Sequence, residues 1–128
     1  MSIEYHIDHE KRTVFAKGRG TFTDADAFGY QHDVWGRPEL AGYHEVMDMT
    51  DVIAIDTPSP TRVRDLALLS AAMDTRTPAS KFAIVAPGDV AFGFGRMFAA
   101  HREANPRSQK EVAVFRSMDA ALKWLGAE

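Results

Sequence analysis

The chain contains no cysteine. This absence excludes a disulfide framework, a thiolate nucleophile and a cysteine-ligated metal site. The sequence also lacks any apolar run approaching the about 18 residues that a membrane-spanning helix needs, and residues 1–10 are polar rather than leader-like. We therefore expect a cytoplasmic protein without a membrane span.

An excess of positive charge is absent as well. Lys and Arg total 15 against 18 Asp and Glu, which gives a formal net charge of −3. A general nucleic-acid-binding domain usually carries a basic face, so this balance argues against nucleic acid as a partner. The 128 residues, 45% of them hydrophobic and 26% charged, are typical of one folded domain, and we expect a single domain over residues 1–128.

Strand-like and helix-like patterns alternate along the chain. Ile3, Tyr5 and Ile7 alternate with polar residues, which predicts a strand that forms a hairpin with residues 12–20. We expect further strands over 43–49, 81–86 and 111–116, with 52–55 continuing or following the first of these. Helices are predicted to begin near residues 23, 60, 89 and 117. The order β-β-α-β-α-β-α-β-α predicts an α/β domain with a mixed, mostly parallel five-stranded sheet and about four helices.

The stretch APGDVAFGFGRMFAAH, residues 86–101, superficially resembles a nucleotide-binding glycine loop. A dinucleotide fingerprint needs a third glycine and lies in the turn between strand and helix. Here Phe98 occupies the third position. With Asp89 as the predicted N-cap, Gly93 and Gly95 fall inside a helix. We therefore expect no nucleotide and no other cofactor.

The same helix predicts a partner-binding face. On a helical wheel Phe92, Gly95, Arg96 and Ala99 lie together. Gly95 and Ala99 would let another backbone come close, and Phe and Arg are frequent anchors of interfaces. The alternative interpretation is that Phe92 is a singly exposed aromatic ring and Arg96 a solvated charge. The opposite face, predicted to pack on the core, contains Val90, Phe94, Met97, Phe98 and His101.

Residues 46–60, VMDMTDVIAIDTPSP, carry a family-specific pattern. They resemble the STAS domains of anti-sigma-factor antagonists, whose strand reads roughly D-(L/I)-(S/T)-G-V-x-x-(I/M)-D-S-S-G. Two positions depart from the pattern: Pro58 replaces the serine that the family phosphorylates, and Ser59 replaces the glycine. Phosphorylation at the usual position is therefore excluded. The matching residues are Asp48, Thr50, Val52, Ile55, Asp56 and Thr57.

Motifs over nearly the whole chain are similar to those of the SpoIIAA-like group of STAS/Sec14-related small bacterial proteins. They include the first hairpin, the GTFTD stretch at 20–24, the strand at 81–87, the FGxxRMF run at 92–98 and the closing VFR and ALxWL segments. The resemblance implies a STAS-like fold and a regulatory or binding role without known catalysis.

The loop at residues 56–60 is a second candidate contact. A phosphate on Thr57 or Ser59 would be favoured at a helix N-terminus by the free amides and the helix dipole. The simpler interpretation is that Ser59 only caps the helix and Asp56 only organises the turn.

Catalytic and metal-binding patterns are weak. The five histidines include no HExxH motif or helical pair; His101 and His32 are expected on the inner faces of their helices. There is no GxSxG elbow. Asp48, Asp51 and Asp56 could serve as acids or hold a cation in an enzyme of unrecognised type, which is the third interpretation. We predict no catalytic residues and no metal site.

These observations favour a non-enzymatic regulatory or binding domain that docks to a protein partner, or to a second copy of itself, through residues 56–60 and 89–102. Phosphorylation of Thr57 or Ser59 would bias that docking. The alternative is a carrier of a small apolar molecule or lipid, as the Sec14 relationship implies. Its pocket would be lined by Phe28, Trp35, Phe92 and Met97, and a large cavity between sheet and helices would favour it.

Overall fold

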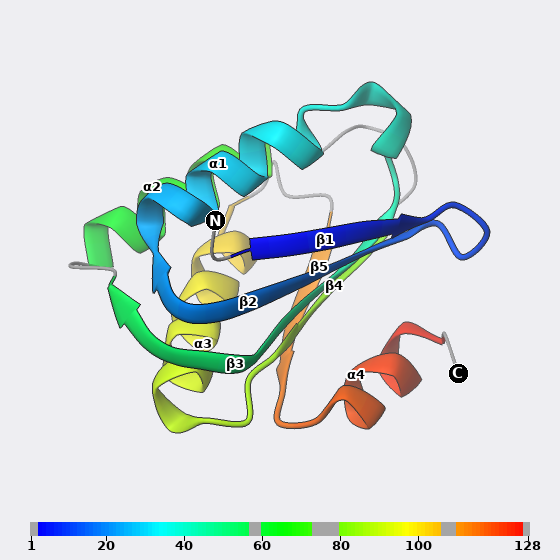
Figure 1. Ribbon diagram of the computed structural model, residues 1–128. Helices are drawn as coiled ribbons and strands as arrows, with labels where there is room; N and C mark the ends of the chain where they lie inside the picture. Colours follow the sequence, from blue (N-terminus) through cyan, green and yellow to red (C-terminus); the bar gives the residue numbers. More distant parts are fainter. Residues whose placement is uncertain (1–2, 57–59, 73–79, 106–109, 127–128) are drawn as a thin grey trace.

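The computed structural model describes residues 3–56, 60–72, 80–105 and 110–126 (Figure 1). Within these ranges, five strands and four helices follow one another in the predicted order, with one short 3-10 helix in addition. The elements are β1 (Ile3–Asp8), β2 (Thr13–Thr23), α1 (Asp24–Trp35), the 3-10 helix η1 (Pro38–Leu40), β3 (His44–Asp56), α2 (Pro60–Ala72), β4 (Ser80–Val85), α3 (Asp89–Glu103), β5 (Lys110–Phe115) and α4 (Met118–Leu125).

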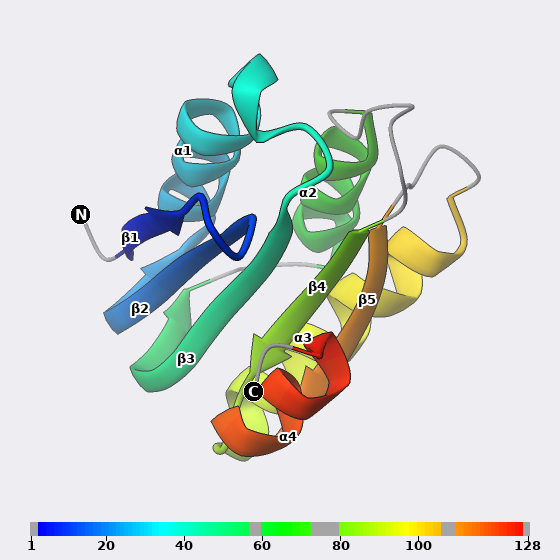
Figure 2. The same ribbon diagram turned by 90° about the vertical axis from the view of Figure 1, so that its right-hand side faces the viewer.

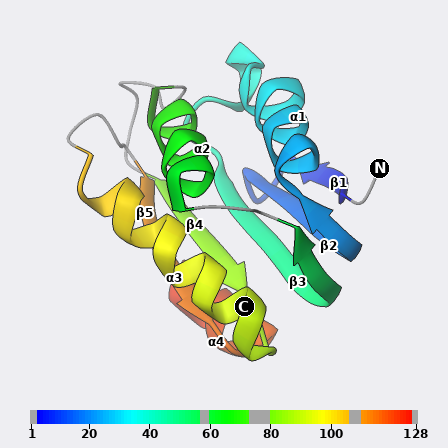
Figure 3. The same ribbon diagram turned by 90° about the vertical axis from the view of Figure 1, so that its left-hand side faces the viewer.

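The sheet has the strand order β1-β2-β3-β4-β5. β1 is antiparallel to β2 and the remaining neighbours are parallel, as predicted. Because consecutive parallel strands are neighbours and their crossovers are right-handed, α1, α2 and α3 fall on one face of the sheet. The short α4 covers part of the opposite face (Figures 2 and 3). None of the helices within the described ranges is long and apolar enough to cross a membrane.

Local capping explains where two helices begin. The Thr23 hydroxyl accepts a hydrogen bond from the Asp26 backbone N–H at 3.1 Å, and Ser117 accepts one from the Ala120 N–H at 3.2 Å. Both caps confirm the prediction. For α3 the prediction was shifted by one residue, because the N-cap is Gly88 and Asp89 is the first helical residue. The predicted Ser59 cap lies outside the described residues.

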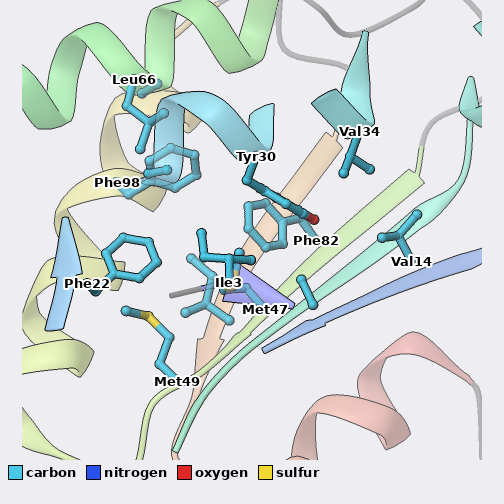
Figure 4. Packing of buried hydrophobic residues seen from close by; sticks show 14 of the residues in the cluster. Ile3, Val14, Phe22, Tyr30, Val34, Met47, Met49, Leu66, Phe82 and Phe98 are labelled. Atoms are coloured by element: carbon cyan, nitrogen blue, oxygen red, sulfur yellow. The ribbon is translucent and has the colours of Figure 1, made fainter. Parts of the chain in front are cut away.

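Two apolar clusters fill the two sides of the sheet. The larger one lies between the sheet and α1–α3, with Met47, Phe82 and Phe98 among its members (Figure 4). The smaller one lies under α4 and contains Val46, Val85 and Ala121. The alternation of Val46 and Met47 along β3 therefore supplies both cores.

The face of α3 that packs on the sheet differs from the predicted one. Its buried residues are Ala91, Gly95, Phe98 and Arg102, whereas Val90 is 71% exposed and Met97 is 39% exposed. The prediction placed the largest apolar residues of the helix against the sheet. A helix that packs closely on a sheet instead needs small residues where the two cross.

Gly95 marks that crossing and is buried there, whereas the prediction placed it on the exposed face of the helix. A Cβ atom there would lie 3.2 Å from Val114 Cγ1 and 3.3 Å from Ile84 Cγ2. The close approach comes from the protein's own sheet. His32 was also misplaced: it is exposed, and its neighbour Gln31 is buried instead. His101 is half-buried.

β3 is one continuous strand of 13 residues, which settles the open question about residues 52–55. Its pairing with β4 ends at Asp48, opposite Val85, while its pairing with β2 continues to Asp56. Residues 19–23 of β2 and 51–56 of β3 thus form a two-stranded ribbon beyond the main sheet. Register shifts near Gly20 (φ 66°) accompany its bend toward α3, where Phe22 and Phe94 meet edge to face with ring centroids 5.8 Å apart.

Candidate functional site

A buried polar cluster lies at the end of the sheet where β3 and β5 begin. The Glu45 carboxylate, whose side chain is 3% exposed, accepts hydrogen bonds from the Tyr30 hydroxyl at 2.8 Å and from Lys110 Nζ at 3.1 Å. The Trp35 indole N–H donates to the Tyr30 oxygen at 3.1 Å, and Lys110 Nζ lies 3.1 Å from the Trp35 ring centroid. Each of these buried polar groups therefore has partners that replace the water it loses on folding.

Burial, and then the charge of Glu45, raise the pKa of Tyr30 well above its ordinary value of 10.0. The hydroxyl therefore stays protonated and acts as a donor. Sequence reasoning missed this cluster, although one signal was present: Glu45 lies in phase with Met47 and Met49 on the core-facing side of β3. A carboxylate in that phase needs buried partners.

A small apolar cavity adjoins this cluster between the sheet and the helices. Its volume is about 40 Å³, far below the roughly 300–1,000 Å³ of small-molecule sites. The residues named for the carrier, Phe28, Trp35, Phe92 and Met97, do not line it. The carrier alternative therefore finds no support in the described residues. The cavity lining is Phe22, Ala27, Tyr30, Gln31, Glu45, Met47, Met49, Leu66, Phe82, Ile84, Phe94 and Phe98.

A groove opens at the other end of β3, between the free side of the ribbon and the first turn of α3. We call it the end groove; its volume is about 220 Å³. Two large apolar residues line it and remain mostly in solvent: Ile53 is 85% exposed and Val90 is 71% exposed. The full lining is Met49, Thr50, Val52, Ile53, Ala54, Ile55, Gly88, Asp89, Val90 and Ala91.

An aromatic ring held by two arginines lies next to this groove. The Arg116 guanidinium carbon is 3.9 Å from the Phe92 ring centroid, and that of Arg96 is 5.9 Å from it. Arg116 is fixed because it donates to Asp89 Oδ1 at 2.7 Å and to the Pro87 carbonyl at 3.0 Å. We call Phe92, Arg96, Arg116 and Asp89 the Phe92 cluster. Asp89 belongs to both features, so they form one continuous surface.

The four predicted partner-binding residues differ in their exposure. Phe92 and Ala99 are half-buried and Arg96 is exposed, whereas Gly95 is buried against the sheet. Arg116 was missed because it follows β5 and is far from α3 in sequence. The only signal was its position in the VFR segment that carried the family resemblance.

The acidic residues of β3 are engaged locally. Asp48 Oδ1 accepts from the Thr50 N–H at 2.9 Å and from its hydroxyl at 2.5 Å, and Asp51 pairs with Lys17 Nζ at 3.1 Å. Asp56 is exposed at the end of the strand. Thr57 and Ser59 lie outside the described residues. No group of three His, Asp or Glu side chains in the described part of the chain could hold a metal ion.

The strand order, with three helices on one face and α4 on the other, defines an α/β domain with a SpoIIAA-like fold. A solved structure with this fold is an uncharacterized protein of the DUF3478 family from Shewanella loihica PV-4. It matches 97% of this chain and 94% of its own with a TM-score of 0.58 and 19% sequence identity. This likeness confirms the predicted fold. The sequence matches no protein-family model, and a search of curated proteins finds no match.

Proposed function

We propose that this protein is a small, non-enzymatic regulatory domain that acts by docking to a partner protein at the end groove. One observation carries the proposal: Ile53 and Val90, two exposed apolar residues from different elements, line the same groove. Contiguous exposed apolar surface with a polar rim is typical of protein interaction sites.

The Phe92 cluster supplies the anchors that such a surface needs. Aromatic and arginine side chains dominate the binding energy of many interfaces. Arg116 is already held against the ring by Asp89 and the Pro87 carbonyl, so it loses little further freedom when a partner binds. Arg96 is exposed beside the same ring, and Ala99 lies one turn further along α3.

Phosphorylation is the regulatory part of the proposal. Residues 57–59 join the exposed end of β3 to the start of α2, so a phosphate on Thr57 or Ser59 would add negative charge close to Asp56. Docking would then depend on the phosphorylation state. Mass spectrometry of the protein from its native cell would detect the phosphate; its absence under all growth conditions would remove this part.

Site-directed photo-crosslinking tests the docking surface. A benzophenone amino acid at position 90 should give a discrete adduct with one partner in native cells, and Ile53→Asp should abolish that adduct. The same amino acid at Lys11, an exposed position in the β1–β2 turn, is the matched control and should give none. Equal adducts from both positions, or none from position 90, would contradict the proposal. An adduct with a second copy of the chain would identify the partner as itself.

A further inference from the structure

We infer that the partner docks as an extended peptide segment that adds a strand to the free edge of β3. This inference rests on the proposed function and specifies it: it names the binding mode and the chemistry of the partner at the end groove. It is drawn from the backbone pairing of the sheet and from the charges around the groove.

The backbone provides an open edge. β3 runs to Asp56, but its last partner in β4 is Val85, opposite Asp48. Beyond Val85 the chain leaves the sheet: the Ala86 N–H bonds to the Phe115 carbonyl, and α3 begins at Asp89. Among the described residues, no backbone hydrogen bond joins residues 50–55 of β3 to β4 or α3. An unpaired strand edge is a template for another strand.

The position of α3 makes this edge a groove rather than a flat rim. Gly88 and the first turn of α3 form its second wall, opposite Thr50 and Ile53. Side chains of an added strand alternate between its two faces. Every second side chain would therefore contact the exposed apolar surface of Ile53 and Val90, which gives a preference for Val, Ile or Leu at alternate positions.

The carboxylates that line and flank the groove favour a basic segment. Asp89 is the charged residue among those lining the groove, and its side chain is 94% exposed. Arg116 donates to Oδ1 of this carboxylate, whose surface nevertheless stays in solvent. Asp51 and the exposed Asp56 flank the groove on β3. Lys17 is paired with Asp51 at 3.1 Å. Lys or Arg between the apolar positions of the added strand would complement these carboxylates.

A synthetic peptide of alternating valine and lysine tests the binding mode on the full chain. We expect it to bind with chemical-shift changes concentrated in the amides of residues 50–55 and 88–91. Two matched peptides separate the contribution of backbone hydrogen bonds from that of charge. N-methylation of alternate backbone nitrogens on one edge, which removes the strand donors, should abolish binding; replacing lysine with glutamate should weaken it at least about tenfold.

Variants of the protein complete the test. Ile53→Ser and Val90→Ser should each weaken peptide binding by about tenfold, since each removes a large apolar contact. Leu68→Ser is the matched control, because Leu68 is 49% exposed on α2 and lines a separate hollow. The inference is overturned if the N-methylated peptide binds as well as the parent, or if no peptide binds. If the position-90 adduct still forms in that case, the docking function stands and only the strand-addition mode fails.

Discussion

The two halves of β3 differ in nearly every physical respect. From His44 to Asp48 the strand lies between β2 and β4, and most of its side chains are buried; from Asp51 to Asp56 it has β2 on one side only and is largely exposed. Burial on both faces stabilises a fold, whereas an unpaired edge with apolar side chains weakens it and invites a partner. The first half therefore holds the domain together, and the second half is where we propose that a partner binds.

The largest effect is expected at Glu45. Glu45→Ala leaves the buried Lys110 without this carboxylate and Tyr30 without its acceptor, which should lower the free energy of unfolding by about 3–5 kcal/mol. Urea denaturation measures the change. The double variant Glu45→Met/Lys110→Met should recover much of the loss, because an apolar pair removes both charges together. If the free energy of unfolding of Glu45→Ala lay within about 1 kcal/mol of the parent value, the first half of β3 would not depend on this cluster.

A pair of apolar truncations compares the halves directly. Met47 is 6% exposed and Ile53 is 85% exposed. Met47→Ala should cost about 2–5 kcal/mol of stability, and Ile53→Ala should stay within about 0.5 kcal/mol. Binding should show the reverse order, with Ile53→Ala weakening the docking of the valine–lysine peptide. If both truncations destabilised the fold equally, the distinction between the halves would be lost.

Two glycines of α3 extend the comparison to the helix that faces β3. A Cβ at Gly95 would press on Val114 and Ile84, whereas nothing lies within 4 Å of a Cβ at Gly93. Gly95→Val should therefore cost about 1–3 kcal/mol through overpacking. Gly93→Ala should gain up to about 1 kcal/mol from helix propensity. Thermal denaturation measures the change in stability of each variant. Changes of the same sign in both variants would contradict the assignment of the buried face.

The smallest effect is a pH dependence at His44, where β3 begins. Burial, with the nearby Lys110, Lys81 and Arg12 charges, lowers the pKa of His44 from its ordinary value of 6.5. Its Nδ1 accepts a hydrogen bond from the Lys81 N–H at 2.9 Å, so the folded state favours the neutral ring. The stability from this group should be complete above pH 6.5 and decline as the pH falls through the lowered pKa. His44→Gln should flatten that slope in pH-dependent urea titrations.

Local signals in the sequence were sufficient for the order of elements. Thr23 and Ser117 cap their helices through their own side chains, and the short, continuously apolar run around Ile84 is typical of a strand buried on both faces. Such features depend on neighbours in the chain, and the predicted topology followed from them.

The site was only partly predictable, because its contacts join distant segments. Phe92 and Arg96 were found as neighbours on one helix, but Arg116 reaches Phe92 from the end of β5. Gly95 was assigned to the wrong face because close helix–sheet packing favours a small residue where the wheel expects a large one. The free edge of β3 depends on where β4 ends its pairing, and strand register is a long-range property.

Amide hydrogen exchange of the full chain, with and without the valine–lysine peptide, tests the central claim most directly. Binding at the free edge should slow exchange in residues 50–55 of β3 and leave residues 45–48, already paired on both sides, unchanged. Protection that is uniform along β3, or confined to elements away from the end groove, would contradict the claim that the second half of this strand is the docking edge.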